Sequence, residues 1–452
     1  MGDDIFRVLS PTAILGYGFP EESFQKGIEK KPHLIAVDAG STDPGPYYLG
    51  AGISFTSKAA VKRDLGLIVK AAVETSIPCI IGSAGGCGAR PHVNWTEGII
   101  REIASESGLS FRMAIIYADI ARTTVQKAMD QGRIDPLYPA LPVTTHEIEK
   151  CVRIVAQMGA EPVSKALDMG CQIILCGRCY DPVPFAAPAI KMGFQPGLAY
   201  HMGKILECAA IAASPGSGRD CVMGTLFGNH FELEALNEKR RFTRVSTAAH
   251  TMYEKSDPYF LPGPGGTLDL SETTFAELDG GRVRVSGSQF HPSDKYTVKL
   301  EGVKSVGFRT ISICGIRDPV LIRCFGTVLD EIKTEIMSEY DCMGNILFHV
   351  YGKNGVMGTL EPEKDAVSHE LGVVIEVVAD AQEQADSLCA RIRSMLLHHS
   401  YPGRISTAGN LALLYSPSDI SCGEVFEFNI YHLMSVEDPV SEFPVEIREV
   451  TP

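Results

Sequence analysis

Four short apolar runs, each ending in small or polar residues, stand out in the N-terminal half of the chain. The first runs from His33 to Asp38 and continues as Ala-Gly-Ser-Thr-Asp-Pro-Gly-Pro, and the others begin at Cys79, Met113 and Ile173. Runs of this length bounded by Gly and Pro are typical of buried strands. In open α/β sheets, ligands bind just past the carboxyl ends of the strands. The pattern therefore predicts one crevice lined by four strand ends, which is typical of enzymes acting on small molecules.

Segments with helical periodicity lie between these predicted strands. Residues 57–76 place apolar side chains at helical spacing, and residues 96–108 repeat the pattern. Strands that alternate with helices in this way predict a mostly parallel sheet with helices on both faces. The α/β pattern continues to about residue 210.

The pattern of apolar and polar residues changes after two Gly/Pro-rich segments, at residues 214–218 and 261–266. Alternating polar and apolar positions predict a β-rich middle region at about 267–325. Beyond it, strands are expected at 345–351, 371–378 and 424–432, with a helix capped by Asp380 between the last two. We therefore predict an α/β domain over residues 1–340 and a C-terminal α+β domain over 345–452.

Composition and net charge argue against several classes of protein. The chain has 452 residues and a formal net charge of −14, which argues against nucleic-acid or anionic-membrane binding because both need basic surfaces. No apolar run approaches the roughly 20 residues of a membrane span, and the N-terminus lacks signal-peptide features. The 13 cysteines are scattered through apolar segments, as reduced buried thiols would be. We expect a cytoplasmic protein and, from the frequency of such assemblies, a homo-oligomer.

The glycine-rich loop after the second strand is a candidate anion site. It reads Gly82-Ser83-Ala84-Gly85-Gly86 and offers backbone amides between a strand and a helix. The alternative is a tight turn with no ligand. A nucleophilic role for Ser83 is disfavoured because the G-x-S-x-G pattern is absent.

Ionisable residues gather in two further segments. Arg178 and Asp181 follow the fourth strand, where the arginine can bind a carboxylate or phosphate, or the two can brace the loop as an internal ion pair. His201, Lys204 and Glu207 lie at i, i+3 and i+6, which places them on one arc of a helix. Such an arc can supply acid, charge and base, or can be a solvated face.

Three smaller features have competing interpretations. Arg317 lies in a polar turn after an apolar run and is a weaker binding candidate. Lys299 and Glu301 share a face of an alternating strand, which favours a simple ion pair. The run Cys171-x4-Cys176-x2-Cys179 copies the spacing of some iron–sulfur ligands, but an intervening strand would place the first two sulfurs on opposite faces. We predict no cofactor, and no local spacing supports a divalent metal.

Several long motifs resemble one known family. They include Val8–Ala13 with Gly16–Glu21, Asp38–Tyr47, Gly82–Gly86, Gly177-Arg178 with Asp181, His201–Glu207, Ala249–Glu254, Tyr296–Gly302 and Gly315–Pro319. Together they resemble the acyclic terpene utilisation (AtuA-like) family over roughly residues 5–350. The segment 345–450 is similar to the ferredoxin-like α+β piece that accompanies this family. The resemblance implies catabolism of branched or isoprenoid acids, often as coenzyme A thioesters or polycarboxylates, without a known set of catalytic residues.

The leading hypothesis is a lyase or hydro-lyase acting next to a carbonyl of a small (poly)carboxylic acid or its CoA ester. Such chemistry needs a base, an anion clamp and a donor for the enolate oxygen. We assign Asp38 or Asp43 as base, the 82–86 amides with Arg178 as clamp, and His201 with Lys204 as donor or charge stabiliser. Glu207, on the same helical arc, is a further catalytic candidate. Candidate substrate contacts also come from residues on loops and turns: Ser41, Thr42, Asp119, Asp181 and Arg317.

Two alternatives belong to different classes. One is a non-catalytic substrate-binding or scaffold subunit of a catabolic complex, which the missing nucleophile, cofactor and metal signatures favour. The other is a hydrolase using Ser41 or Ser83. The cluster of ionisable groups on strand-end loops favours the enzyme.

Overall fold

The computed structural model describes residues 5–339 and 344–452, which form a mixed α/β protein. The described chain divides into two compact units. The first contains residues 1–304 and 428–452, and the second contains residues 305–427. The sequence instead predicts a boundary between residues 340 and 345. Among the described residues, no helix is both long and apolar enough to cross a membrane.

A ten-stranded mixed sheet forms the centre of the first unit, in the order β12-β13-β9-β8-β1-β2-β3-β7-β4-β20. Strands β1, β2, β3, β7 and β4 pair in parallel, whereas β8 and β20 flank them in antiparallel pairings. The strands are β1 (Phe6–Ser10), β2 (Leu34–Asp38), β3 (Cys79–Gly82), β4 (Phe111–Ile116), β7 (Ile173–Cys176), β8 (Val222–Leu226), β9 (His230–Ala235), β12 (Thr274–Leu278), β13 (Arg282–Ser286) and β20 (Val445–Val450).

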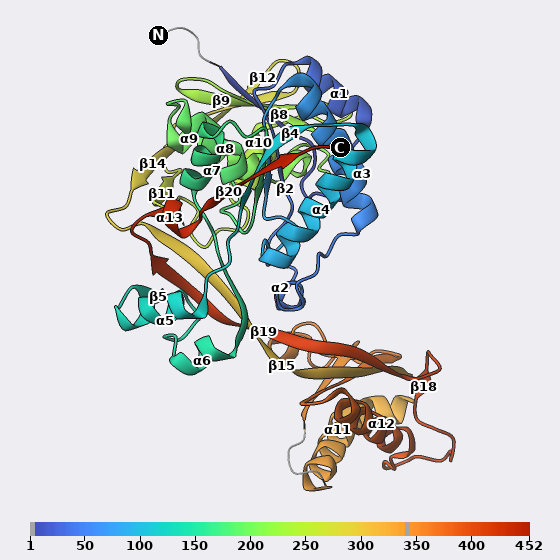
Figure 1. The fold of residues 1–452 in the computed structure, drawn as a ribbon. Helices are drawn as coiled ribbons and strands as arrows, with labels where there is room; N and C mark the ends of the chain where they lie inside the picture. Colours follow the sequence, from blue (N-terminus) through green and yellow to red (C-terminus); the bar gives the residue numbers. More distant parts are fainter. Residues whose placement is uncertain (1–4, 340–343) are drawn as a thin grey trace. The chain divides into compact units, whose positions relative to one another are not determined.

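Helices cover both faces of this sheet (Figure 1). Strand residues alternate between two buried cores, so that Ala36 packs with α8 and α9 while Val37 packs with α3 and α4. This alternation is the period-two pattern expected of strands buried on both sides. The helices are α1 (Glu21–Glu29), α3 (Lys58–Thr75), α4 (Arg90–Ser107), α7 (Ala160–Asp168), α8 (Val183–Lys191) and α9 (Pro196–Leu206).

Smaller elements complete the first unit. Strands β10 (Phe260–Gly263), β11 (Gly266–Asp269) and β14 (Gln289–Pro292) form an antiparallel sheet. The start of β15 (Thr297–Ile316) pairs with β6 (Cys151–Ala156), and the end of β19 (Asp419–Ser435) pairs with β5 (Ile134–Pro136). The remaining helices are α2 (Pro46–Ala51), α5 (Arg122–Asp130), α6 (Thr145–Lys150), η1 (Ala209–Ala212), α10 (Arg244–Thr251) and α13 (Pro439–Glu442).

The second unit has the order strand, helix, two strands, helix, strand. The end of β15 pairs with β17 (Leu371–Ala379), which also pairs with β16 (Asn345–Tyr351). Helices α11 (Pro319–Glu339) and α12 (Gln382–His398) supply its core together with the inward side of β17. The short η2 (Gly358–Leu360) and β18 (Ala412–Leu413) complete it.

Most elements predicted from periodicity are confirmed. The four strand ends lie at β2, β3, β4 and β7, the helices at 57–76 and 96–108 are α3 and α4, and the β-rich middle region is β11 to β15. One detail is wrong, because the N-cap of α12 is Ala381 and no side chain caps it. The long helix α11 was not predicted, since its apolar face follows directly on the Arg317 turn without a composition break.

Candidate functional site

Arg178 is the centre of a buried polar cluster at the carboxyl end of β7. The strand ends at Cys176, and a Cβ atom at the next residue, Gly177, would come within 2.6 Å of the Gly88 carbonyl oxygen, so glycine permits the close packing of these two loops. The Nε of Arg178 donates to Glu301 Oε2 at 2.8 Å, and its Nη1 donates to Asp181 Oδ1 at 3.1 Å and to Ser83 Oγ at 3.3 Å. Arg178 is only 2% exposed. A buried guanidinium is tolerated because carboxylates on two sides neutralise it.

The cluster continues as a chain of alternating charges. Lys299 Nζ lies 2.8 Å from Glu301 Oε1, and beyond Arg178 the Oδ2 of Asp181 lies 3.1 Å from Lys204 Nζ. Although burial acts in the opposite direction, Arg178 and Lys299 lower the pKa of Glu301 to about 2. Asp181 behaves alike: burial opposes the shift, but Lys204 and Arg178 hold its pKa below the usual range. Both carboxylates therefore stay ionised at neutral pH.

Helix α9 supplies Lys204 and ends at Leu206, with Glu207 as its C-cap residue. Nearly every residue of this helix is buried, so its polar side chains reach partners in the interior rather than solvent. Lys204 Nζ lies 2.6 Å from Glu207 Oε1 and 3.9 Å from Glu254 Oε2. Burial raises the pKa of Glu207 well above its usual value. Of the two interpretations of this arc, the solvated face is therefore wrong, because Lys204 and Glu207 are buried and lie in contact.

Asp38 ends β2 beside the cluster but differs from the other carboxylates. Its Oδ2 accepts from the Gly40 amide at 3.2 Å, and its Oδ1 has no hydrogen-bond partner among the described residues. Burial, reinforced by the nearby Asp181 carboxylate, raises the pKa of Asp38 well above its usual value. The environment of Asp38 therefore favours the protonated form of its carboxyl, in contrast to Glu301 and Asp181.

A cavity of about 390 Å³ opens onto the cluster. This volume lies within the range of small-molecule sites. Its polar wall contains Asp43, Gln157, Arg178, Tyr180, Asp181, Lys204, Glu254, Ser256 and Lys299. Its apolar wall is formed mainly by Leu137, Leu261, Pro262, Pro264, Tyr431 and Leu433. The cavity thus joins a wall of three cations and three carboxylates to apolar walls, a combination that suits a ligand with a polar group and a hydrocarbon body.

Two non-glycine residues with left-handed backbone lie at this site. Ser83 has φ 44° and Glu254 has φ 55°. Such conformations cost about 1 kcal/mol or more and gather at functional sites. Ser83 uses its position to accept from Arg178, and Glu254 uses its position to reach the cavity and Lys204.

The glycine-rich loop at residues 82–86 packs against the loop that carries Arg178. The amides of Ser83, Ala84 and Gly86 donate to the carbonyls of Gly177, Cys176 and Ser83, respectively. A Cβ atom at Gly88 would overlap the backbone nitrogen of Arg178, so only glycine permits the close approach of the two loops. The structure therefore favours the tight-turn interpretation of residues 82–86 over an anion cradle.

His201 lies on α9 but faces away from the cavity. Its Nδ1 is 2.7 Å from Ser288 Oγ and its Nε2 is 2.9 Å from Thr251 Oγ1, so both ring nitrogens already have partners. Burial lowers the pKa of His201 to about 3. Its ring packs edge-on against Phe231. This arrangement is typical of a neutral core histidine rather than a proton donor to substrate.

Of the other predicted site residues, some lie at the Arg178 cluster and others lie away from it. Thr42 Oγ1 donates to Glu301 Oε1 at 3.1 Å, and Ser41 Oγ donates to Asp43 Oδ2 at 2.7 Å, which places both in or beside the cluster. Asp119 lies apart from the cavity lining, where burial raises its pKa despite the nearby Arg90. Arg317 belongs to the second unit, between β15 and α11.

The sequence did not single out several residues that line the cavity. Neither Tyr180 nor Glu254 was named as a site residue, although Tyr180 lies within the predicted Arg178–Asp181 loop. The predicted Lys299–Glu301 ion pair is confirmed, but the pair also belongs to the site. The pairing of β15 with β6 brings these residues to the cavity, and no local pattern encodes that long-range contact.

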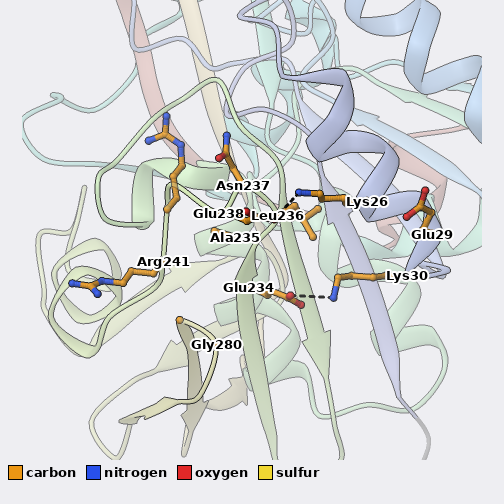
Figure 2. Close-up of a pocket in the computed structure, with 12 residues that line it drawn as sticks. Lys26, Glu29, Lys30, Glu234, Ala235, Leu236, Asn237, Glu238, Arg241 and Gly280 are labelled. Carbon is orange, nitrogen blue, oxygen red and sulfur yellow. Dashed lines mark hydrogen bonds and ion pairs between the residues drawn. The ribbon is translucent and has the colours of Figure 1, made fainter.

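A second hollow in the first unit has a volume of about 620 Å³ (Figure 2). Lys30 Nζ pairs with Glu234 at 3.0 Å, and Lys26 Nζ pairs with Glu238 at 3.3 Å, as the dashed lines show. These side chains are substantially exposed, and their charges are matched in separate pairs. The larger hollow is therefore a solvated surface groove, whereas the smaller cavity is lined by the buried, linked ionisable side chains.

Metal-binding geometry is not evident in the described part of the chain, where no group of three or more His, Cys, Asp or Glu side chains converges. The thiols of Cys176 and Cys179 are buried, and burial raises the pKa of each. They are therefore poor nucleophiles in this fold.

Comparison with known proteins gives one family. No significant match to a curated protein or to a solved structure was found. Residues 60–216 and 236–413, however, match the sequence model described as acyclic terpene utilisation family protein AtuA. The matched residues include Arg178, Asp181, Lys204 and Glu301 and cover most of the chain. The chain therefore belongs to the acyclic terpene utilisation family AtuA.

Proposed function

We propose that the protein is a lyase or hydro-lyase that acts next to a carbonyl of a small (poly)carboxylic acid or its CoA ester. The reaction would serve the catabolism of branched or isoprenoid acids, in keeping with the family's name. The observation that carries the proposal is the cavity itself, which is lined by Arg178, Lys204 and Lys299 together with an exposed Asp43. Cations fixed in a partly water-excluded site stabilise the negative charge that develops when a proton leaves carbon.

The clamp role falls to three cations. Arg178 has no described hydrogen bond from its Nη2, and it lines the cavity together with Lys204 and Lys299. Ion pairs with Glu301 and Asp181 hold Arg178 and Lys204 in position at the cavity. A bound carboxylate or thioester oxygen would meet charge that is already oriented, so little reorganisation is needed during the reaction.

Asp43 is the better candidate for the base. It is exposed, lines the cavity and is oriented by the Ser41 hydroxyl. Asp38 does not line the cavity, and burial raises its pKa well above the usual value, which favours its protonated form. We therefore assign proton abstraction to Asp43 and an internal structural role to Asp38.

Hydrogen exchange at carbon tests this assignment without knowledge of the complete reaction. The protein is incubated in D₂O with isovaleryl-CoA, as a branched thioester, and with citrate, as a polycarboxylate. Loss of the α-hydrogen signal is followed by NMR. We expect exchange with at least one probe and a fall of about 100-fold or more in Asp43→Asn, in the range of general-base losses. Binding by calorimetry without exchange would instead support the scaffold-subunit alternative.

We further propose that the second unit is ferredoxin-like. Its order of strand, helix, two strands, helix and strand, with antiparallel pairing of β15, β17 and β16, supports this assignment.

A further inference from the structure

Tyr180 is held rigidly in the wall of the cavity. It lies in the Arg178–Asp181 turn, and its amide donates to the Met158 carbonyl at 3.0 Å. The ring lies 6.1 Å from the ring of Tyr200 on α9. On its other side is Gly263 of β10, where a Cβ atom would come within 2.7 Å of the ring. A side chain at position 263 would therefore displace the phenol.

The hydroxyl of Tyr180 is buried and has no hydrogen-bond partner among the described residues. An unsatisfied buried hydroxyl costs about 1–3 kcal/mol, so a folded protein usually avoids one. Three other buried atoms around Lys204 also lack partners: Asp38 Oδ1, Glu207 Oε2 and Lys255 Nζ. Tyr180 differs from Asp38, Glu207 and Lys255 because it lines the cavity. Its missing partner can therefore come from a ligand.

We infer that Tyr180 is a catalytic residue of the proposed reaction, whose hydroxyl donates a hydrogen bond to the carbonyl oxygen next to the reacting carbon. This inference rests on the proposed function. Asp43 takes the α-hydrogen as a proton, and the C–H electron pair becomes the new C=C bond. The carbonyl π electrons move to oxygen, which accepts the hydrogen bond from Tyr180. When the proton returns from Asp43 to carbon, the carbonyl re-forms.

The surroundings of Tyr180 make it a donor rather than a base. Burial raises the pKa of the phenol well above its usual value, and the Lys204 ammonium offsets only part of this shift. The hydroxyl therefore keeps its proton at neutral pH. Lys204 lines the same cavity and adds positive charge there, so the two groups together stabilise an enolate better than either group alone. Tyr180 thereby takes the donor role that the sequence assigned to His201.

The test compares Tyr180→Phe with Tyr200→Phe. Tyr200 is a buried tyrosine whose ring packs on Tyr180, but it does not line the cavity. We expect Tyr180→Phe to slow α-hydrogen exchange about 100- to 1,000-fold, the range for loss of one donor to an oxyanion. Tyr200→Phe should retain the wild-type rate. The melting temperature of Tyr180→Phe should be unchanged or higher, because an unsatisfied hydroxyl is removed.

A second measurement uses 3-nitropropionate in its ionised form, whose nitronate oxygens resemble an enolate. Calorimetry should show binding to wild type and Tyr200→Phe, and about 10-fold weaker binding to Tyr180→Phe, the equivalent of one hydrogen bond. Wild-type exchange or nitronate affinity in Tyr180→Phe would overturn the role of Tyr180 and leave the proposed function standing. A wild-type protein that neither exchanges nor binds nitronate would overturn the proposed function and this inference with it.

Discussion

The Arg178 cavity and the hollow of Figure 2 are built from the same kinds of residue with opposite consequences. In the hollow, Lys30 and Glu234 are 43% and 32% exposed, so water solvates each charge. At the cavity, the side chains of Arg178 and its partner Glu301 are 3% and 2% exposed, so each charge depends on its partner. Burying an ion pair often costs more than its attraction returns. A protein that maintains the five linked charges of Lys299, Glu301, Arg178, Asp181 and Lys204 is therefore preserving an electrostatic arrangement rather than gaining stability from it.

The largest expected difference comes from removing one carboxylate at each place. Glu301→Gln removes one of the two carboxylates that neutralise the buried Arg178, and also the carboxylate that pairs with the half-buried Lys299, so we expect a loss of about 3–5 kcal/mol in the free energy of unfolding. Glu234→Gln in the hollow should cost below about 1 kcal/mol. Urea unfolding followed by the fluorescence of Trp95, the chain's single tryptophan, reports on the first unit. Similar losses for both variants would remove the distinction between the two regions.

A glycine at each place gives the next comparison. Gly88 and Gly280 both have left-handed backbone, at φ +65° and +76°. An alanine at position 280 meets nothing within 4 Å, so Gly280→Ala should cost only the backbone strain of about 1–2 kcal/mol. At Gly88 the added carbon also overlaps the Arg178 backbone, which should add about 1–3 kcal/mol. Thermal melts together with the α-hydrogen exchange rate measure both effects, and only Gly88→Ala should alter exchange.

The sequence predicts the frame of this cavity better than its chemistry. Strand and helix positions follow from short-range periodicity, and the strand-end rule correctly brings Asp38, Ser83 and Arg178 together. Burial, however, is decided by the tertiary environment. The arc of His201, Lys204 and Glu207 gives no sign that the histidine faces Ser288 while the lysine faces the cavity. Likewise, the contribution of Glu301 depends on a strand pairing between residues far apart in sequence.

The pH dependence of stability tests whether burial alone controls ionisation on α9. With the pKa of His201 lowered by burial to about 3, the folded protein leaves this ring neutral between about pH 3 and 6.5, while the unfolded chain protonates it. The unfolded state then binds one more proton, so stability falls as pH drops from 6.5, by about 1.4 kcal/mol per pH unit. His201→Gln should remove this part of the slope in urea titrations at several pH values. An unchanged slope would show that the ring is charged in the folded state.

The smallest expected effect is in the hollow itself and concerns salt. A double-mutant cycle with Lys30→Gln and Glu234→Gln should give a coupling energy of about 0.2–1 kcal/mol at low ionic strength. In 1 M salt the screening length falls to about 3 Å, so this coupling should vanish. The Arg178–Glu301 pair is shielded from ions by the surrounding protein, so the cost of Glu301→Gln should hardly change under the same conditions. If salt erased both effects equally, the cluster would be open to solvent, and the fixed charges on which the proposed chemistry depends would be lost.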